Sequence, residues 1–400
     1  MNQATADFIR NNADADVRQL ALRGTKVSEV DLPFALDQIA GRQMARHKLP
    51  SWAAIDGIIY PPHLSMEQCS SEQTARYKAQ ILADKCSPKG SACLVDLTGG
   101  FGVDFAFIAQ TLSSDIRHCV YVERQEHLCA IAKENFLRLG LPQVEVVCAD
   151  SVKYLQTMEP SEIIFLDPAR RDCRGGRTYG ISDCTPDVLA LRDLLLHKAR
   201  YVLLKLSPML DWRKAVSDLG KQHVREVHIV SVHNECKELL ILLGPGEGFK
   251  LVCVNDGDQF EVSGNGSDEI YQFGEPCAGK YLYEPNASIM KAGIFAGLSQ
   301  NFDVAPIAPN SHLFVSADFI GTFPGRIFQI GTVCSLNKRD LKTHLHGISQ
   351  ANITTRNFPL SVAELRRRLK LNDGGDTYIF ATTLVSGYRV LLICRKVFFT

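Results

Sequence analysis

The sequence predicts an α/β fold in which a largely parallel sheet is covered by helices. From about residue 91 to 244, strand-like apolar runs alternate with helix-like segments, which is the pattern of βαβ units. One of these runs, within 94–104, ends in an acidic residue and a glycine-rich turn. Such a turn is typical of an open α/β sheet that binds a nucleotide-like ligand at the carboxyl ends of its strands.

The segments on either side of this sheet predict three further parts. Residues 1–90 carry amphipathic helical patterns, including Ser70 as an N-cap with Gln73 three residues later. The glycines at 244–248 break the pattern, and β-rich segments with a few helices follow. We expect a helical N-terminal domain at 1–90, the α/β domain at 91–245, and two small α+β domains at 249–324 and 325–400.

Composition excludes several classes of protein. The 400 residues include 44 Lys and Arg and 44 Asp and Glu, so a strongly basic protein is excluded, although charge can still be segregated by domain. The 13 cysteines are scattered and form no Cys-x-x-Cys pair, which predicts neither a disulfide framework nor a metal site and favours the reducing cytoplasm. The chain shows no signal-peptide pattern and no apolar run of about 18 residues, so we expect no membrane partner.

The glycine-rich turn differs from the dinucleotide-binding fingerprint. That fingerprint requires Gly-x-Gly-x-x-Gly, and its third glycine lets the helix pack closely on the strand. Here Gly100 and Gly102 are followed by Phe105 at the third position. A bound pyrophosphate, and with it a nicotinamide-dependent oxidoreductase, is therefore disfavoured.

Acidic residues at successive strand ends favour S-adenosylmethionine instead. Asp96 would face the methionyl ammonium group, Glu123 would accept both ribose hydroxyls, and Asp150 would meet the adenine amino group. The alternative is that Glu123 and Asp150 only cap the helices that follow them. The turn itself is also expected to line the cofactor, through Thr98, Gly99, Gly100, Gly102 and Asp104.

The fourth apolar run ends in Asp167-Pro168, which predicts the acceptor site. A carboxylate and a rigid turn at this strand end would lie beside the methyl group and orient the nucleophile. Many methyltransferases that act on exocyclic amines have an aromatic residue in this motif, whereas this chain has Ala169-Arg170. Arg170 and Arg171 begin a basic loop that suits a phosphate-bearing substrate such as RNA, although a solvated arginine loop is the alternative.

Two further basic residues are candidates for contact with the substrate. Lys205 follows the fifth apolar run and could line the substrate mouth or pair with Asp167. Arg356 lies near the carboxyl end, before a helix whose arginines at 366–368 are expected to point outward from Leu365 and Leu369. These arginines could bind RNA or form a solvated charged face.

The chain resembles bacterial class I methyltransferases that carry a THUMP-like domain. The likeness lies in the segment from Asp96 to Asp104, in Asp167-Pro168-Ala169-Arg170, in Glu284-Pro285-Asn286-Ala287 and in Arg356-Asn357-Phe358-Pro359. It implies a Rossmann-like class I methyltransferase sheet, a helical N-terminal part, a ferredoxin-like domain at 249–324 and a THUMP-like domain at 325–400. The short link between the apolar runs 224–232 and 238–243 predicts an antiparallel hairpin at one edge, as in such sheets. THUMP domains proper bind RNA, so the resemblance also implies RNA methylation.

The sequence therefore predicts a cytoplasmic methyltransferase that uses S-adenosylmethionine to methylate a base of RNA, in tRNA or rRNA, by direct transfer without a metal. Two alternatives remain open. One is a non-catalytic RNA-binding protein with a relic methyltransferase fold. The other is a methyltransferase that acts on a small molecule or a protein.

Overall fold

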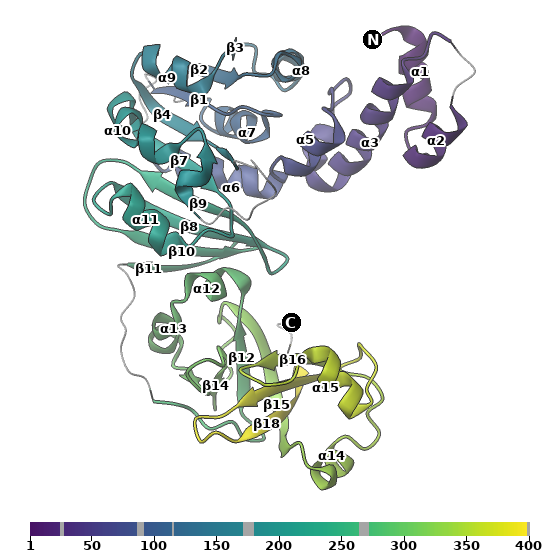
Figure 1. The fold of residues 1–400 in the computed structure, drawn as a ribbon, viewed down its shortest axis with the longest axis vertical. Coiled ribbons are helices and arrows are strands. Elements are labelled where there is room, and N and C mark those ends of the chain that lie inside the picture. Colours follow the sequence, from purple (N-terminus) through teal and green to yellow (C-terminus); the bar gives the residue numbers. More distant parts are fainter. Residues whose placement is uncertain (25–27, 86–91, 114–115, 171–179, 264–271, 398–400) are drawn as a thin grey trace. The chain divides into compact units, whose positions relative to one another are not determined.

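The computed structural model describes residues 1–24, 28–85, 92–113, 116–170, 180–263 and 272–397 (Figure 1). The chain forms two compact units that interleave along the sequence. The first contains Met1–Arg225 and Leu239–Glu247, and the second contains Glu226–Glu238 and Gly248–Thr400.

The first unit begins with helices, as the amphipathic patterns predict. They are α1 (Gln3–Asn11), α2 (Val17–Arg23), α3 (Leu32–Lys48), α4 (Pro50–Ala53), α5 (His63–Gln68) and α6 (Glu72–Ala83). The N-cap of α6 is Ser71, whose hydroxyl accepts from the backbone N–H of Thr74, so the predicted cap at Ser70 is wrong by one residue. None of the helices in the described ranges is long and apolar enough to cross a membrane.

The chain then forms a nine-stranded sheet whose order confirms the predicted α/β fold, and its strands at 250–255 and 258–263 belong to the second unit. The strands are β1 (Ala92–Asp96), β2 (Ile116–Glu123), β3 (Val144–Cys148), β4 (Ser161–Leu166), β7 (Ala199–Leu206), β8 (Val224–Val232), β9 (Glu235–Leu243), β10 (Lys250–Asn255) and β11 (Asp258–Ser263). Their order is β11-β10-β8-β9-β7-β4-β1-β2-β3. The five neighbouring strands β7, β4, β1, β2 and β3 pair in parallel, and β9 is antiparallel to β7.

The sequence predicted the hairpin of β8 and β9 at the edge of the sheet, and this is wrong, because both strands lie inside it. β10 pairs in parallel with β8, and β11 pairs antiparallel with β10. The reason lies in β10, where the four consecutive residues 251–254 are all buried. An unbroken buried run of this kind is typical of a strand in the interior of a sheet, and β10 has β8 along one edge and β11 along the other.

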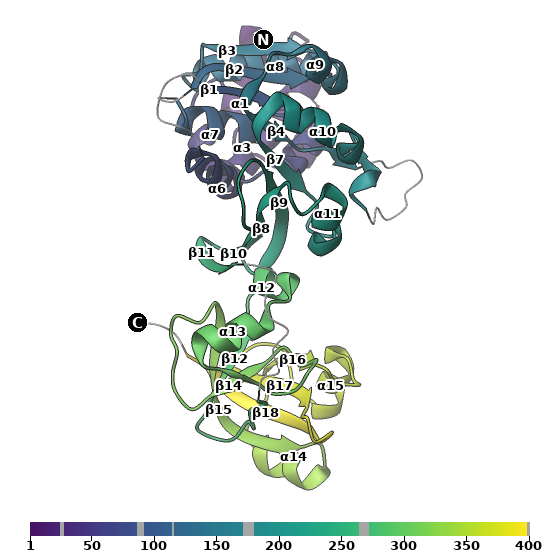
Figure 2. The same ribbon diagram turned by 90° about the vertical axis from the view of Figure 1, so that its left-hand side faces the viewer.

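Helices cover both faces of the sheet in the first unit. Figure 2 shows α9, α10 and α11 along one face and α6 and α7 on the other. The helices between the strands are α7 (Val103–Thr111), α8 (Glu126–Arg138), α9 (Ser151–Thr157), α10 (Val188–Lys198) and α11 (Trp212–Leu219). Between β4 and α10 the chain forms the short strands β5 (Ala169–Arg170) and β6 (Cys184–Thr185), with the 3-10 turn Ile181–Asp183 before β6.

The second unit contains a seven-stranded sheet in its carboxyl-terminal part. Its strands are β12 (Tyr281–Pro285), β13 (Ala305–Pro306), β14 (Phe314–Ser316), β15 (Gly325–Ser335), β16 (Asn352–Arg356), β17 (Thr377–Thr383) and β18 (Arg389–Lys396). Their order is β13-β14-β12-β15-β18-β17-β16. The helices are α12 (Ala287–Ala292), α13 (Phe295–Phe302), α14 (Lys338–His344) and α15 (Val362–Leu369). The division into four domains predicted from the sequence stays a prediction.

Candidate active site

The glycine-rich turn between β1 and α7 leaves open space beside its backbone. Gly100 and Gly102 have φ angles of +58° and +82°, which residues with a Cβ rarely adopt. A Cβ on Gly99 would come within 2.1 Å of the Tyr121 ring. A Cβ on Gly100 would approach only the carbonyl oxygen of Thr98, at 3.9 Å, so a ligand can approach the backbone there.

Asp96 ends β1 beneath this turn as a buried carboxyl group. It is 1% exposed, and its Oδ1 accepts from the backbone N–H of Thr98 at 2.8 Å. Burial raises the pKa of Asp96 well above its usual range, and the nearby acidic side chains of Asp104, Asp167 and Glu123 raise it further. A cationic group placed beside Asp96 would relieve this unfavourable concentration of acidic groups.

Thr98 connects the turn to the strand end that carries Asp167. Its hydroxyl oxygen accepts from the backbone N–H of Asp167 at 2.6 Å and lies 3.5 Å from Asp96 Oδ1. One side chain therefore fixes the distance between the expected cofactor turn and the expected acceptor site.

Glu123 ends β2 and supports the turn from the next strand. Its Oε2 accepts from Gly100 N at 2.9 Å, and its Oε1 accepts from Gln125 N at 2.8 Å. The side chain is buried, and Tyr121 donates from its hydroxyl to the carbonyl oxygen of Gly100. A carboxylate has about four lone-pair sites, so these two hydrogen bonds leave capacity for two more donors.

Asp150 is the N-cap of α9, which matches the alternative considered from the sequence. Its Oδ1 accepts from the backbone N–H groups of Val152 and Lys153, both at 3.1 Å, and the residue is exposed. Oδ1 makes both bonds, and no hydrogen bond from the described residues reaches Oδ2. The contact with adenine stays a prediction.

Asp167 and Lys205 form an ion pair at the ends of β4 and β7. Lys205 Nζ donates to Asp167 Oδ2, and its side chain is 12% exposed against 38% for that of Asp167. Pro168 is buried and follows directly. The structure thus brings together two residues that the sequence placed at the acceptor site, and it shows the pairing that was one of the two possibilities for Lys205.

Asp104 connects this pair to residues that sequence reasoning missed. Its Oδ2 accepts from the Ser70 hydroxyl at 2.8 Å and lies 3.6 Å from Lys205 Nζ, while its Oδ1 lies 3.1 Å from Lys78 Nζ. The expected contact of Asp104 with the cofactor stays a prediction. The signal for Lys78 was present in the sequence, since it lies on the apolar face of α6 with Ala75 and Leu82.

The other predicted substrate residues are placed differently. Arg170 pairs through its backbone with β6, and Arg171 lies outside the described residues. Arg356 belongs to β16 in the second unit, where its guanidinium donates to Glu284 Oε1 at 2.9 Å. Glu284 is 3% exposed and also accepts from Arg326. Arg356 therefore pairs with a buried carboxylate of the second unit, which is a structural role.

Within the described ranges, no group of three or more His, Cys, Asp or Glu side chains is arranged to hold a metal ion. Leu365 and Leu369 are buried, and Arg367 and Arg368 are exposed, as the helical pattern predicts. Arg366 differs from the prediction, because it is half-buried and donates to the carbonyl oxygens of Ala351 and Asn372.

Comparisons with known proteins agree with this architecture. A THUMP domain-like family matches residues 325–396, and a ferredoxin-like domain family matches residues 281–324. Uncharacterized S-adenosylmethionine-dependent methyltransferases from two strains of Mycobacterium tuberculosis are 23% identical over 340 residues, covering 83% of this chain and 87% of theirs. A crystal structure of a protein from Porphyromonas gingivalis W83, assigned as a methyltransferase, is 31% identical, covers 99% of this chain and 98% of its own, and has a TM-score of 0.85. The chain belongs to this family of S-adenosylmethionine-dependent methyltransferases.

The residues of this methyltransferase fit its cofactor. The site combines the four acidic side chains Asp96, Asp104, Glu123 and Asp167 with two lysines, so acidic groups are in excess. S-adenosylmethionine carries an ammonium, a sulfonium and a carboxylate group, so its net charge is positive and such an excess attracts it. The open side of Gly100 gives it room. Asp96 and Glu123 are the residues that would hold it, and their contacts with the cofactor stay predictions.

Proposed function

We propose that this methyltransferase transfers the methyl group of S-adenosylmethionine directly to a base of RNA, in tRNA or rRNA. The observation that carries the proposal is the half-exposed Asp167 carboxylate, paired with Lys205 at the same sheet edge as Asp96 and Glu123. An acceptor that contacts Asp167 would lie beside the glycine turn, where the methyl donor is expected.

The contacts of each residue suggest its role in binding or transfer. Glu123 would accept from the ribose hydroxyls, and Asp96 would face the methionyl ammonium group. When bound, S-adenosylmethionine supplies an electrophilic methyl group. Asp167 and Pro168 would orient the acceptor atom, and positioning of this kind can supply most of the rate in a direct transfer.

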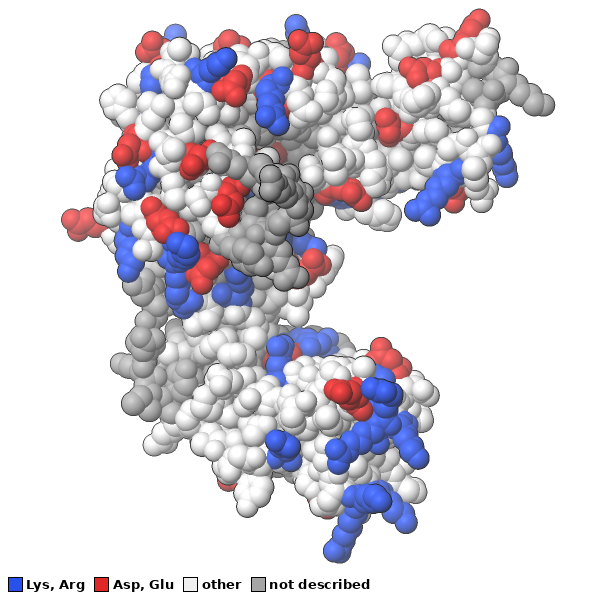
Figure 3. Space-filling model, in the orientation of Figure 1, with Lys and Arg blue, Asp and Glu red and all other residues white. Residues whose placement is uncertain are grey.

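The second unit supports RNA as the substrate. Figure 3 shows Lys and Arg side chains gathered over the part of this unit that contains α14 and α15. The exposed basic residues of these helices are Lys338, Arg339, Lys342, Arg367 and Arg368. Basic side chains of this kind neutralise phosphates, and the match to a THUMP domain-like family favours the same substrate. Zero net charge for the chain therefore reflects segregation of charge.

We also propose a cytoplasmic location. No disulfide joins the cysteines in the described parts of the chain, which is the usual state of thiols in that compartment.

The test is incubation of the full chain with isotopically labelled S-adenosylmethionine and undermodified total RNA, followed by nucleoside analysis. We expect one labelled nucleoside, and no label with the Asp167→Asn variant. Label in a protein or small-molecule fraction, with none in RNA, would show that the substrate is a protein or a small molecule. Cofactor binding without label in any fraction would favour a non-catalytic RNA-binding protein.

A further inference from the structure

Four charged side chains of alternating sign run from the interior of the first unit to the candidate acceptor site. Lys78 Nζ lies 3.1 Å from Asp104 Oδ1, Lys205 Nζ lies 3.6 Å from Asp104 Oδ2, and Lys205 also donates to Asp167. The exposed fractions of the side chains rise along this series: 0% for Lys78, 10% for Asp104, 12% for Lys205 and 38% for Asp167. Only the last member is open enough to meet a substrate.

Asp104 is shared between two lysines, and this sharing sets its ionisation. Burial raises the pKa of the Asp104 carboxyl, but Lys78 and Lys205 outweigh burial and hold the pKa below its usual value. A buried charge is stable only when it is paired and hydrogen-bonded. Lys78 also donates to the Ser70 hydroxyl at 3.1 Å, and that hydroxyl donates to Asp104.

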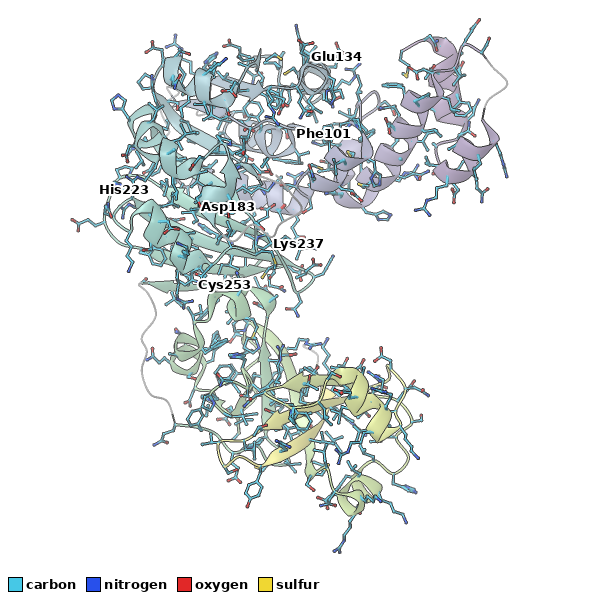
Figure 4. The ribbon with its side chains drawn as sticks, in the orientation of Figure 1. Phe101, Glu134, Asp183, His223, Lys237 and Cys253 are labelled. Atoms are coloured by element: carbon cyan, nitrogen blue, oxygen red, sulfur yellow. The ribbon has the colours of Figure 1, made fainter. Side chains whose placement is uncertain are left out.

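Lys78 and Ser70 come from the helical N-terminal part of the chain. The same part also packs on the glycine-rich turn, since the Phe101 ring lies edge-on to Trp52 with ring centroids 5.2 Å apart (Phe101 is labelled in Figure 4). The helical part therefore meets the candidate site through both an apolar and a charged contact.

We propose that Lys78 is a positioning residue for methyl transfer, because by neutralising Asp104 it keeps Lys205 directed to Asp167. The inference rests on the proposed function in that Asp167 orients the acceptor. Without Lys78, Lys205 is the cationic side chain that still neighbours the buried Asp104 among the residues that the structure describes. Lys205 would then move towards Asp104 and away from Asp167.

The test compares Lys78→Met with the charge-balanced variant Lys78→Met/Asp104→Asn and with Lys214→Met. Lys214 is a matched control, because its side chain is 63% exposed and pairs with Asp218 on the surface of α11. For Lys78→Met we expect kcat to fall about tenfold or more at saturating cofactor and RNA, while the Kd for S-adenosylmethionine changes less than about threefold. At saturating cofactor the second variant should recover most of the lost kcat, since Asp104 no longer competes for Lys205. Its Kd for S-adenosylmethionine is measured separately, because Asp104 is itself an expected cofactor contact. Lys214→Met should behave as the wild type.

The split between transfer and binding separates positioning from a structural role. A merely structural loss in Lys78→Met would lower kcat, cofactor affinity and thermal stability together, and the added Asp104→Asn would not restore transfer. Wild-type kcat in folded Lys78→Met would overturn the proposal. If Lys78→Met does not fold, the charge-balanced variant decides. Wild-type kcat in that variant supports the inference, and loss of transfer with cofactor binding intact overturns it.

A readout without activity keeps the two proposals distinguishable. If the wild type labels no RNA, the proposed function fails, and crystal structures of the variants still test the charge sharing. In the wild type Lys205 Nζ donates to Asp167 and lies 3.6 Å from Asp104. In Lys78→Met we expect the reverse, with Lys205 Nζ closer to Asp104 than to Asp167. Lys205 remaining on Asp167 in both would overturn the inference.

Discussion

Replacement of Glu123 by alanine should abolish most of the affinity for S-adenosylmethionine. The carboxylate already accepts from Gly100 N and Gln125 N and has capacity for the two ribose hydroxyls. Two hydrogen bonds to a charged group, at about 1.5–3 kcal/mol each, amount to about 3–6 kcal/mol. Each 1.4 kcal/mol is a factor of ten, so the Kd should rise at least about a hundredfold. Isothermal titration calorimetry on the full chain measures this directly.

The matched control is Glu126→Ala, three residues further along the chain. Glu126 is exposed in the first turn of α8, so its loss should leave the Kd within about twofold. Thermal unfolding of both variants shows whether the fold is intact, which matters because Glu123 also supports the turn. Unchanged cofactor affinity in a folded Glu123→Ala variant would refute the assignment of Glu123 to the ribose.

Three further variants test other parts of the first unit. Asp167→Ala should keep cofactor affinity within about threefold and lose transfer, because Asp167 is assigned to the acceptor; binding and labelling assays check both. Asn135→Ala should lower the free energy of unfolding by about 2–4 kcal/mol, because it removes two 2.8 Å hydrogen bonds to the Ile59 backbone; urea unfolding measures the loss. Glu72→Gln should cost about 1 kcal/mol at neutral pH, because the lost charge weakens hydrogen bonds from Ser51 and Arg76.

The pH dependence of the Glu72 variant follows from the direction of its pKa. Burial raises the pKa of Glu72, but the hydrogen bonds outweigh burial and lower it from 4.5. A lowered carboxyl pKa stabilises the fold above the unfolded value, and this contribution is lost as the pH falls through the folded value. The difference from wild type should therefore shrink below pH 4.5. A constant difference would contradict this assignment.

The assignments tested by Asp167→Ala and Asn135→Ala can also be refuted. Transfer at the wild-type rate by Asp167→Ala would show that Asp167 does not orient the acceptor. The exposed Lys133 on the same helix is the control for Asn135, and Lys133→Ala should change stability by less than about 0.5 kcal/mol. An equal effect of the two substitutions would show that the Asn135 bonds contribute nothing.

The sequence predicted the strand-end carboxylates because their placement depends only on local order. A residue at the end of a parallel strand lies at the carboxyl edge of the sheet, so Asp96, Glu123 and Asp167 could be located from the apolar runs that precede them. Their contacts with ligand stay predictions.

The lysine network could not be read in the same way, because it depends on tertiary contacts. Ser70 and Ser71 are equally good caps locally, and Ser71 caps α6 while the Ser70 hydroxyl reaches Asp104. A lysine on an apolar helix face was the visible sign that Lys78 has a buried partner. That sign does not identify Asp104, which lies on α7.

The extended sheet shows a similar limit. The glycine-rich break at 244–248 suggested the end of the domain, yet β10 resumes the sheet beside β8. The run of buried residues in β10 predicts an interior strand, but its neighbour is β8, eighteen or more residues earlier in the chain. Pairing between distant segments is the information that local patterns lack.

The interleaving of the two units has a consequence for how the protein is made. Going from amino to carboxyl end, the chain leaves the first unit after Arg225, returns at Leu239 and leaves again after Glu247. Domains generally fold as units during synthesis, in amino-to-carboxyl order. Here the first unit lacks a complete β9 until residue 243 has emerged from the ribosome, and by then Glu226–Glu238 of the second unit has already been synthesised. Nascent chains that stop before residue 239 should therefore not complete the fold of the first unit, although most of it is already present.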